Sequence, residues 1–559
     1  MLGTTFSRRR FLATTGLIAA GTLLSNCSSS STSTPSSAGS GQATGSTSAA
    51  AGSSPAAVKS SKNTITFPII ANPGTLNPIK ESSTAEGQVA SVIHCSLVRL
   101  DPTNFDPKPY LAESWEASAD AKSWTFKLRS RVKFHDGTDC TADDVKFTMD
   151  KMLDPKVNSA RGKQFLLVDS TEVVDPSTVT FHLKSPWAAF PTILAGRWDV
   201  VPKHILESVD VASDTSFDKK PIGIGPYTLS EWVASDHLLL KANKNFFLGP
   251  PKIDTMAFKV LPDANIQIAQ LKTGELDAIP FFPDASIPAV SGQTGLTVDS
   301  GAASIWYAMH LNLNRPDLFG DQKVRQALSY AIDRQALIDN LLGGHGQIAT
   351  GPIIPQITWA YDPNVMQYPH DPAKAKALLT SAGWTQGSDG VWTKGGVKLD
   401  FTLSAFQGNS TVDQCATLVQ QNWADIGVKT KIEVLEFSTF ITQVRDNRGP
   451  DGYYSFVSYM TPEPEPDGNY AYFASNNAER GSNFTAYKNP EVDQLLETGR
   501  AETDQAKRKD AYFKFQEIVA VDLPRIFLFY PQEHLARHTN LMGLPSSNAL
   551  RFTENAYFT

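Results

Sequence analysis

Helical and strand periodicities alternate in the second half of the chain, and this alternation limits the possible folds more than any other feature of the sequence. Apolar residues recur at helical spacing in two segments that each begin at an aspartate, and they alternate with polar residues in two segments that follow. The helical segments are residues 321–344 and 371–383, and the strand segments are residues 397–403 and 428–434. Interleaved helices and strands favour α/β lobes over an all-β sandwich or a helix bundle.

The first half of the chain shows the same mixture. Apolar and polar residues alternate along residues 124–129 and 179–184, which is the period of strands with one buried and one solvated face. Between them, Thr141 precedes two aspartates, so that a hydroxyl can cap a helix whose first turn carries carboxylates. We expect this helix to continue to Met152.

The N-terminal residues indicate export. Residues 7–12 read SRRRFL and lead into an apolar stretch, residues 11–24, which is too short to span a bilayer but suits the core of a signal peptide. The paired arginines resemble the twin-arginine signal, whose cargo crosses the membrane already folded. No run of 18 or more apolar residues occurs in the sequence, so we expect no membrane-spanning helix.

A cysteine follows the apolar stretch. Residues 24–27, LSNC, resemble a lipobox, in which the cysteine becomes the lipidated first residue of the mature protein, although Asn26 departs from the usual small residue. Residues 28–61 are almost wholly Ser, Thr, Ala, Gly and Pro, so they predict a disordered tether. We therefore expect Cys27 to anchor the protein to the outer face of the cytoplasmic membrane.

The size and charge of the chain limit its function classes. The 559 residues suffice for three or four domains, and a hydrophobic fraction of 41% is enough for large buried cores. With 57 acidic and 50 basic residues the net charge is −7, which lacks the basic footprint of a nucleic-acid-binding protein. We therefore exclude a nucleic-acid partner.

The motifs that carry catalytic or metal chemistry are incomplete. Residues 223–228 lack the third glycine of a dinucleotide fingerprint, and residues 463–474 lack the final glutamate of a calcium loop. His534 and His538 have zinc-like spacing, but we expect them in a solvated loop after a buried strand. We expect no metal and no cofactor. We favour buried thiols and leave one disulfide open for three cysteines: Cys95, Cys140 and Cys415.

Several longer motifs occur in one order from about residue 62 onward. They are LVRLD (97–101), PYLAESW (109–115), KFHDG (133–137), TADDV (141–145), PIGIGPY (221–227), LKTGELDA (271–278), VRQAL (324–328), AIDR (331–334) and DPAKA (371–375). Together they resemble the extracellular solute-binding proteins of family 5, which serve peptide- and nickel-type ABC importers. Many motifs in a fixed order are far more specific than any single one.

The resemblance implies a fold and partners. The fold is the α/β, two-lobed periplasmic-binding-protein fold of type II, with an extra third domain and no catalysis. By resemblance, lobe I comprises residues 62–105, 215–303 and 526–559, the small extra domain residues 106–214, and lobe II residues 304–525. The partners would be the permease and ATPase subunits of an ABC transporter, and the protein itself would act as a monomer.

The resemblance also places candidate ligand-binding residues on loops that face a cleft between the lobes. In the first lobe and the small domain these candidates are Asn77, Trp198, Gly225 and Tyr227. In the second lobe they are Trp306, Tyr307, Asn312, Tyr459, Met460, Glu463 and Asp467.

The residues before Glu465 bear on the class of ligand. Peptide-binding members carry an acidic residue a few positions upstream of this stretch, where it neutralises the α-ammonium group of the peptide, because an unpaired buried ammonium is costly. Here Thr461 or Pro462 takes that position, and Glu463 is the only acidic substitute. We expect an oligopeptide as the ligand and keep a sugar, a metal chelate or another small molecule as alternatives, since aromatic side chains would accept those as well. An exported hydrolase and a structural surface lipoprotein remain as alternatives from other classes.

Overall fold

The computed structural model describes residues 63–479 and 481–559. The predicted signal segment, Cys27 and the tether through residue 61 lie outside these residues. None of the helices within them is long and apolar enough to cross a membrane.

The first sheet of the chain has four strands, in the order β1-β10-β9-β8. They are β1 (Thr64–Ile69), β10 (Thr255–Val260), β9 (His237–Ala242) and β8 (Tyr227–Val233). β1 runs parallel to β10 and the other pairs are antiparallel. Helix α1 (Thr84–Ile93) buries Val89 and Val92 in the same core as Phe67 and Phe258, whose rings stack at 5.8 Å. Ser83 and Glu86 form a capping box that fixes the start of this helix.

A second four-stranded sheet, β4-β5-β7-β6, is entirely antiparallel. Its strands are β4 (Ala112–Ala117), β5 (Ser123–Leu128), β7 (Thr178–Leu183) and β6 (Val168–Asp175), with helices α2 (Ala142–Leu153) and α3 (Phe190–Arg197) beside it. The ring of Phe181 lies 5.7 Å from that of Phe126 and 5.1 Å from that of Phe190, so α3 packs on the sheet through aromatic contacts. Both predicted strands and the helix capped by Thr141 are confirmed.

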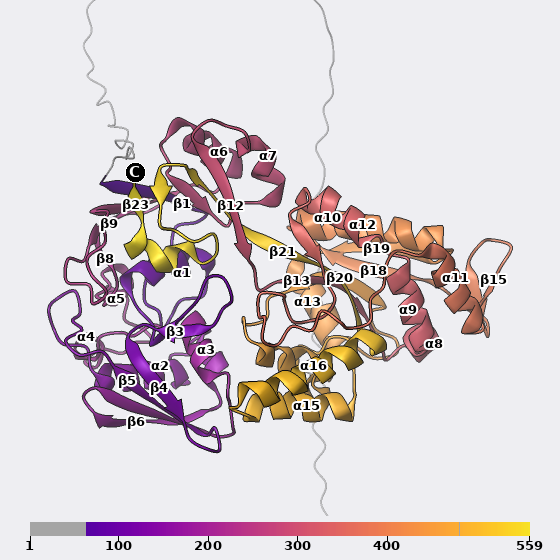
Figure 1. Cartoon of the computed structure of the whole chain (residues 1–559), viewed down its shortest axis with the longest axis horizontal. Coiled ribbons are helices and arrows are strands. Elements are labelled where there is room, and N and C mark those ends of the chain that lie inside the picture. Colours follow the sequence, from indigo (N-terminus) through magenta and orange to yellow (C-terminus); the bar gives the residue numbers. More distant parts are fainter. Residues whose placement is uncertain (1–62, 480) are drawn as a thin grey trace, which may run out of the picture. The chain divides into compact units, whose positions relative to one another are not determined.

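The largest sheet has eight strands and is organised around one long strand, β21 (Arg525–His538). The first residues of β21 pair with β13 (Trp306–Leu311) and β14 (Gly346–Ile348). Its last residues pair with β12 (Leu296–Ala302) and β11 (Ala278–Pro280). Beyond β13 the sheet continues with β20 (Ser455–Met460), β18 (Asp400–Phe406) and β19 (Lys429–Leu435). Figure 1 shows β21 passing from the part that contains β12 into the part that contains β20.

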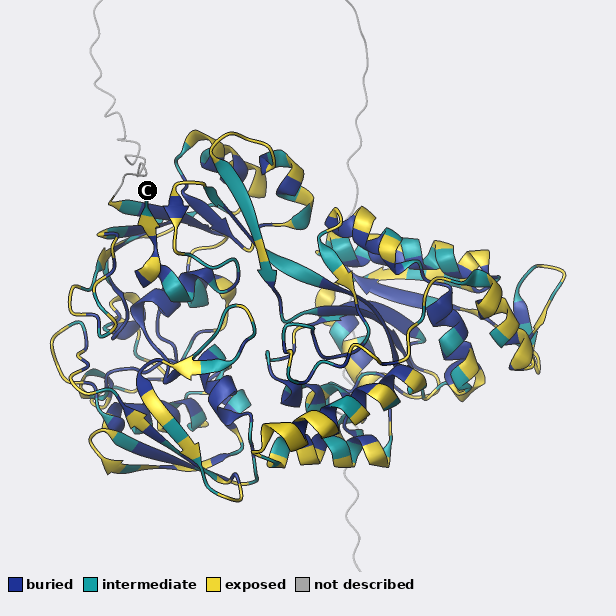
Figure 2. Ribbon diagram, viewed as in Figure 1, coloured by how far each residue is buried: buried dark blue, intermediate teal, exposed yellow. Residues whose placement is uncertain are grey.

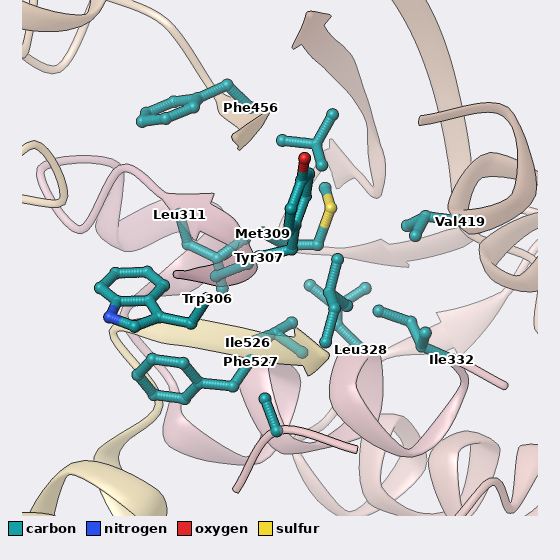
Figure 3. Packing of buried hydrophobic residues seen from close by; sticks show 14 of the residues in the cluster. Trp306, Tyr307, Met309, Leu311, Leu328, Ile332, Val419, Phe456, Ile526 and Phe527 are labelled. Atoms are coloured by element: carbon teal, nitrogen blue, oxygen red, sulfur yellow. The ribbon is translucent and has the colours of Figure 1, made fainter. Parts of the chain in front are cut away.

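Helices surround the β13 end of this sheet. The longer ones are α9 (Gln322–Tyr330), α10 (Arg334–Leu342), α11 (Pro372–Ser381), α12 (Ser410–Asp425), α13 (Phe437–Asp446), α15 (Pro490–Ala501) and α16 (Gln505–Asp522). Figure 2 shows buried central strands and exposed outer faces on these helices. Figure 3 shows the core between them, where Trp306 of β13 packs against Phe527 of β21 with ring centroids 5.2 Å apart.

The remaining elements are short and join these layers. The strands are β2 (Val98–Leu100), β3 (Pro107–Pro109), β15 (Thr385–Gln386), β16 (Trp392–Lys394), β17 (Val397–Lys398), β22 (Leu541–Met542) and β23 (Tyr557–Phe558). The helices are α4 (Lys203–Leu206), α5 (Ser216–Lys219), α6 (Ala264–Thr273), α7 (Ile287–Val290), α8 (Pro316–Phe319) and α14 (Tyr470–Phe473).

Two local predictions are wrong. The helical pattern of residues 321–344 forms two helices, α9 and α10, because Asp333 caps a new helix by accepting a hydrogen bond from the N–H of Ala336 at 3.0 Å. His534 and His538 lie on β21 rather than in a solvated loop, and His534 is buried. The three cysteines, in contrast, are buried free thiols, as favoured by the sequence.

Candidate ligand-binding site

A cavity lined by residues 531–534 of β21 and by the segments after β11 and β20 adjoins a second cavity. The larger has a volume of about 490 Å³, and the smaller has a volume of about 380 Å³. They share three lining residues, Gly196, Phe281 and Asn548. Their sizes fall within the range of about 300–1,000 Å³ that is typical of small-molecule sites. We therefore treat the larger cavity with its neighbour as the candidate ligand-binding site.

The walls of the larger cavity come from segments that follow strand ends. Residues 281–284 follow β11, residues 302–305 join β12 to β13, residues 461–464 follow β20, and residues 531–534 belong to β21. Hydrogen bonds fix these segments to one another: the N–H of Phe282 donates to the carbonyl of His534 at 2.9 Å, and the hydroxyl of Ser304 donates to the carbonyl of Pro462 at 2.8 Å. The loops therefore have a rigid frame.

Aromatic and apolar side chains line part of this cavity: Phe105, Phe281, Phe282, Ile305 and Tyr307. The Tyr307 ring is held between Phe529 and Tyr459, with centroids 4.6 Å and 5.4 Å away. Phe281 is 50% exposed, although it is a large apolar residue, and its φ of 55° lies in the left-handed region. The ring of Phe281 is therefore accessible at the wall of the larger cavity.

Charged groups line the same cavity. The buried imidazole of His534 is oriented from both sides, since its Nδ1 lies 2.7 Å from the Ser300 hydroxyl and its Nε2 lies 2.9 Å from Asp284 Oδ1. Glu533, next to it on β21, accepts a hydrogen bond from the N–H of Asn548 at 3.1 Å. Burial raises the pKa of Glu533 to about 7. Glu463 contributes a further carboxylate to the lining.

The smaller cavity carries ion pairs instead. Arg161 contacts Glu81, and Arg551 lies 3.3 Å from Asp199. Burial raises the pKa of Glu81 to about 7, and the charge of Arg161 opposes that rise. The charges at this end of the site are thus compensated within the protein.

A direct contact joins the small antiparallel domain to the α15 region. The indole N–H of Trp187, just before α3, donates to Asp467 Oδ2 at 2.9 Å, and the N–H of Ala188 donates to the carbonyl of Arg500 at 2.7 Å. Asp467 also accepts hydrogen bonds from the Arg500 guanidinium at 2.9 and 3.2 Å. This link holds together two parts of the chain that are about 280 residues apart in sequence.

Two of the residues predicted from the resemblance, Tyr307 and Glu463, line the larger cavity. The ring of Tyr459 packs against that of Tyr307 at an interplanar angle of 38°. The others have structural surroundings that account for them without a ligand. Trp198, Tyr227, Trp306 and Met460 are buried in the cores. Asn77, Gly225 and Asn312 bond to nearby backbone groups, and Asp467 bonds to Trp187 and Arg500.

Most lining residues were not predicted from the sequence, and four of them carry the chemistry described above: Phe281, Asp284, Glu533 and His534. Residues 281–284 and 533–534 meet only because β11 pairs with the end of β21, a contact between segments about 250 residues apart. The raised pKa of Glu533 and the exposure of Phe281 also depend on the folded surroundings. A weak signal was available in the apolar pair at 281–282, which directly follows a buried strand.

Comparisons with known proteins identify the family and the fold of the chain. The profile of the family "Bacterial extracellular solute-binding proteins, family 5 Middle" matches residues 106–481. The chain is 32% identical over 485 residues to the "Oligopeptide-binding protein AppA" of Bacillus subtilis, covering 85% of this chain and 87% of the relative.

Two solved structures extend the comparison. The structure of AppA from Bacillus subtilis in complex with a nonapeptide matches with a TM-score of 0.70 and 30% identity, covering 89% of this chain and 99% of that one. NikZ from Campylobacter jejuni in complex with Ni(L-His) matches with a TM-score of 0.72 and 28% identity, covering 89% and 100%. The mixed α/β, two-lobed fold expected from the sequence is thereby confirmed.

Proposed function

The chain belongs to the bacterial extracellular solute-binding proteins of family 5, the substrate-binding components of ABC importers, and we propose that its ligand is an oligopeptide held in the larger cavity. The observation that carries the proposal is the cavity itself. It has the volume of a small-molecule site and combines aromatic walls with carboxylates and a buried histidine.

Peptides fit this lining for chemical reasons. A peptide offers apolar side chains to Phe281 and Tyr307, backbone amides to loop carbonyls, and charged groups to Glu463 or Glu533. The named ligand of the AppA relative, an oligopeptide, supports the same class. A sugar or a metal chelate is the competing ligand. Because the NikZ structure contains a nickel–histidine complex, the experiment below includes that chelate as a probe.

The domain layout is part of the proposal. Residues 62–105, 215–303 and 526–559 form one lobe, residues 304–525 form the other, and residues 106–214 form the small domain. The chain would cross between the lobes near residue 303 and along β21. These crossings act as a hinge, and ligand closes the site because it binds the closed arrangement more tightly.

The location of the protein follows from its N-terminal sequence. A twin-arginine signal exports the folded chain, and lipid on Cys27 anchors it outside the cytoplasmic membrane, from where it delivers ligand to a permease driven by an ATPase subunit. The protein acts as a monomer in this scheme.

Calorimetry on the protein after unfolding and refolding, which removes any ligand carried from the cell, tests the ligand class. A mixed di- to pentapeptide pool should give saturable heat, and mass spectrometry of the retained peptides should identify the preferred ones. No heat with the peptide pool, together with a clear signal from nickel–histidine or a glycoside, would refute the oligopeptide assignment.

A further inference from the structure

The half-buried carboxylate of Glu533 lacks the arginine partner that five buried carboxylates of the protein have. Five buried carboxylates each contact an arginine: Glu81, Asp199, Glu465, Asp467 and Glu554 pair with Arg161, Arg551, Arg508, Arg500 and Arg99. Glu533 makes no ion pair within residues 63–479 and 481–559, and its hydrogen bond comes from the neutral N–H of Asn548. Glu533 is therefore a carboxylate in the larger cavity that no cation of the described residues neutralises.

The neighbours of Glu533 do not neutralise it. His534 is adjacent in sequence, but both of its ring nitrogens are engaged by Ser300 and Asp284. The other titratable groups around this wall are Glu463 in the cavity lining and His345, whose ring lies 5.6 Å from that of His534. Burial raises the pKa of Glu533 to about 7, and no neighbouring cation in the part of the chain that the structure describes opposes that rise as Arg161 does at Glu81.

We propose that Glu533 is the residue that pairs with a positively charged group of the ligand, an ammonium or a guanidinium. This inference rests on the proposed function, because it assumes that the larger cavity holds the ligand. From the sequence, Glu463 in the loop after β20 was the candidate for binding a ligand cation. The inference assigns this role to Glu533 on strand β21 instead. Phe281, Phe282 and Tyr307 line the same cavity, so the favoured ligand carries its charge next to an apolar group.

If Glu533 pairs with a ligand cation, the affinity for ligand should depend on the pH. A cation binds the ionised carboxylate, so the affinity should rise as the pH increases through about 7, and binding should release a proton from Glu533 at neutral pH. The variant Glu533→Gln keeps the shape of the side chain and cannot ionise. It should therefore lose both the affinity and the proton release.

Calorimetry on the full chain provides the test, with three probes: a pool of di- to pentapeptides with free amino termini, a pool of N-acetylated peptides without Lys, Arg or His, and arginine with spermidine as non-peptide cations. We expect the free peptides to bind, and Glu533→Gln to weaken that binding about 100-fold, in the range seen when a buried charge pair loses one member. The matched control Glu113→Gln, an exposed carboxylate on β4, should leave the affinity unchanged.

The outcomes separate this inference from the proposed function. If peptides bind Glu533→Gln as tightly as the original protein, or if the acetylated pool binds as well as the free pool, the role of Glu533 is refuted while the peptide function stands. If no peptide binds but arginine or spermidine binds in a Glu533-dependent manner, the peptide function is refuted and the role of Glu533 stands. If no cationic probe binds, the inference is refuted as well. Titrations in two buffers with different ionisation enthalpies count the released protons and check that the loss is electrostatic.

Discussion

The hydrogen bond from Trp187 to Asp467 should stabilise the arrangement in which the small domain contacts the α15 region. Trp187→Phe removes this donor and keeps an aromatic ring against Phe190. A hydrogen bond to a charged group contributes about 1.5–3 kcal/mol. The lower end applies here, because both oxygens of Asp467 keep their bonds to Arg500 after the substitution.

A loss of about 1.5 kcal/mol corresponds to a roughly tenfold fall in the ratio of the contacting to the separated arrangement. If ligand binds the contacting arrangement, the affinity for the peptide pool should fall by up to the same factor. The matched control is Trp124→Phe, which makes the same change in the same core. The indole of Trp124 donates instead to the backbone carbonyl of Trp187, at 3.1 Å, within the small domain.

Small-angle scattering of the ligand-free variants measures the effect. Trp187→Phe should increase the radius of gyration, and Trp124→Phe should not, while urea unfolding reports the cost of the smaller ring that both variants share. Superimposable scattering curves and equal peptide affinities for the two variants would refute the stabilising role of the Trp187–Asp467 bond.

Three further predictions concern the anchor, the free carboxylate and the exposed ring. Cys27→Ala should move the protein from the membrane fraction to the soluble fraction, and unchanged retention and mobility would contradict lipidation at this residue. In the ligand-free protein, the raised pKa of Glu533 stabilises the fold at low pH, and this stabilisation is lost as the pH rises from about 4.5 through about 7. The unfolding free energy of Glu533→Gln, relative to that of the original protein, should therefore rise across this pH range by up to about 3 kcal/mol. Urea unfolding that gives the same difference between the two proteins at pH 4.5 and at pH 8 would contradict this. Phe281→Ala should weaken peptide binding about tenfold, through lost apolar contact, with a change in unfolding free energy below about 1 kcal/mol because the ring is 50% exposed; an equal affinity would show that the ring does not contact ligand.

The local elements were predictable from the sequence because their causes are local. The helix after Thr141 follows from its capping box, and the alternation along residues 124–128 and 179–183 follows from one buried sheet face. The division between α9 and α10 was missed because the apolar stripe continues across it. Asp333 was the available signal, as an N-cap residue placed inside an apparently continuous pattern.

The candidate site was less predictable, since it is assembled from distant segments. Tyr307 and Glu463 were found through the family resemblance. Glu533 carries no local mark of function, because its character comes from the missing cation around it, and that property exists only in the folded chain. The same holds for Phe281, which reaches the cavity through the pairing of β11 with β21.

Strand β21 sets the order in which this protein can be assembled. All four strands that pair with it, β11, β12, β13 and β14, precede it in the chain, so the ribosome releases each of them before residues 525–538 exist. The central sheet must wait for that segment, and pairings over such long sequence separations are slow to form. A chain exported during synthesis would therefore reach the membrane with this sheet incomplete, whereas the twin-arginine export that we propose would carry the finished, folded molecule and avoid exposing those unpaired edges.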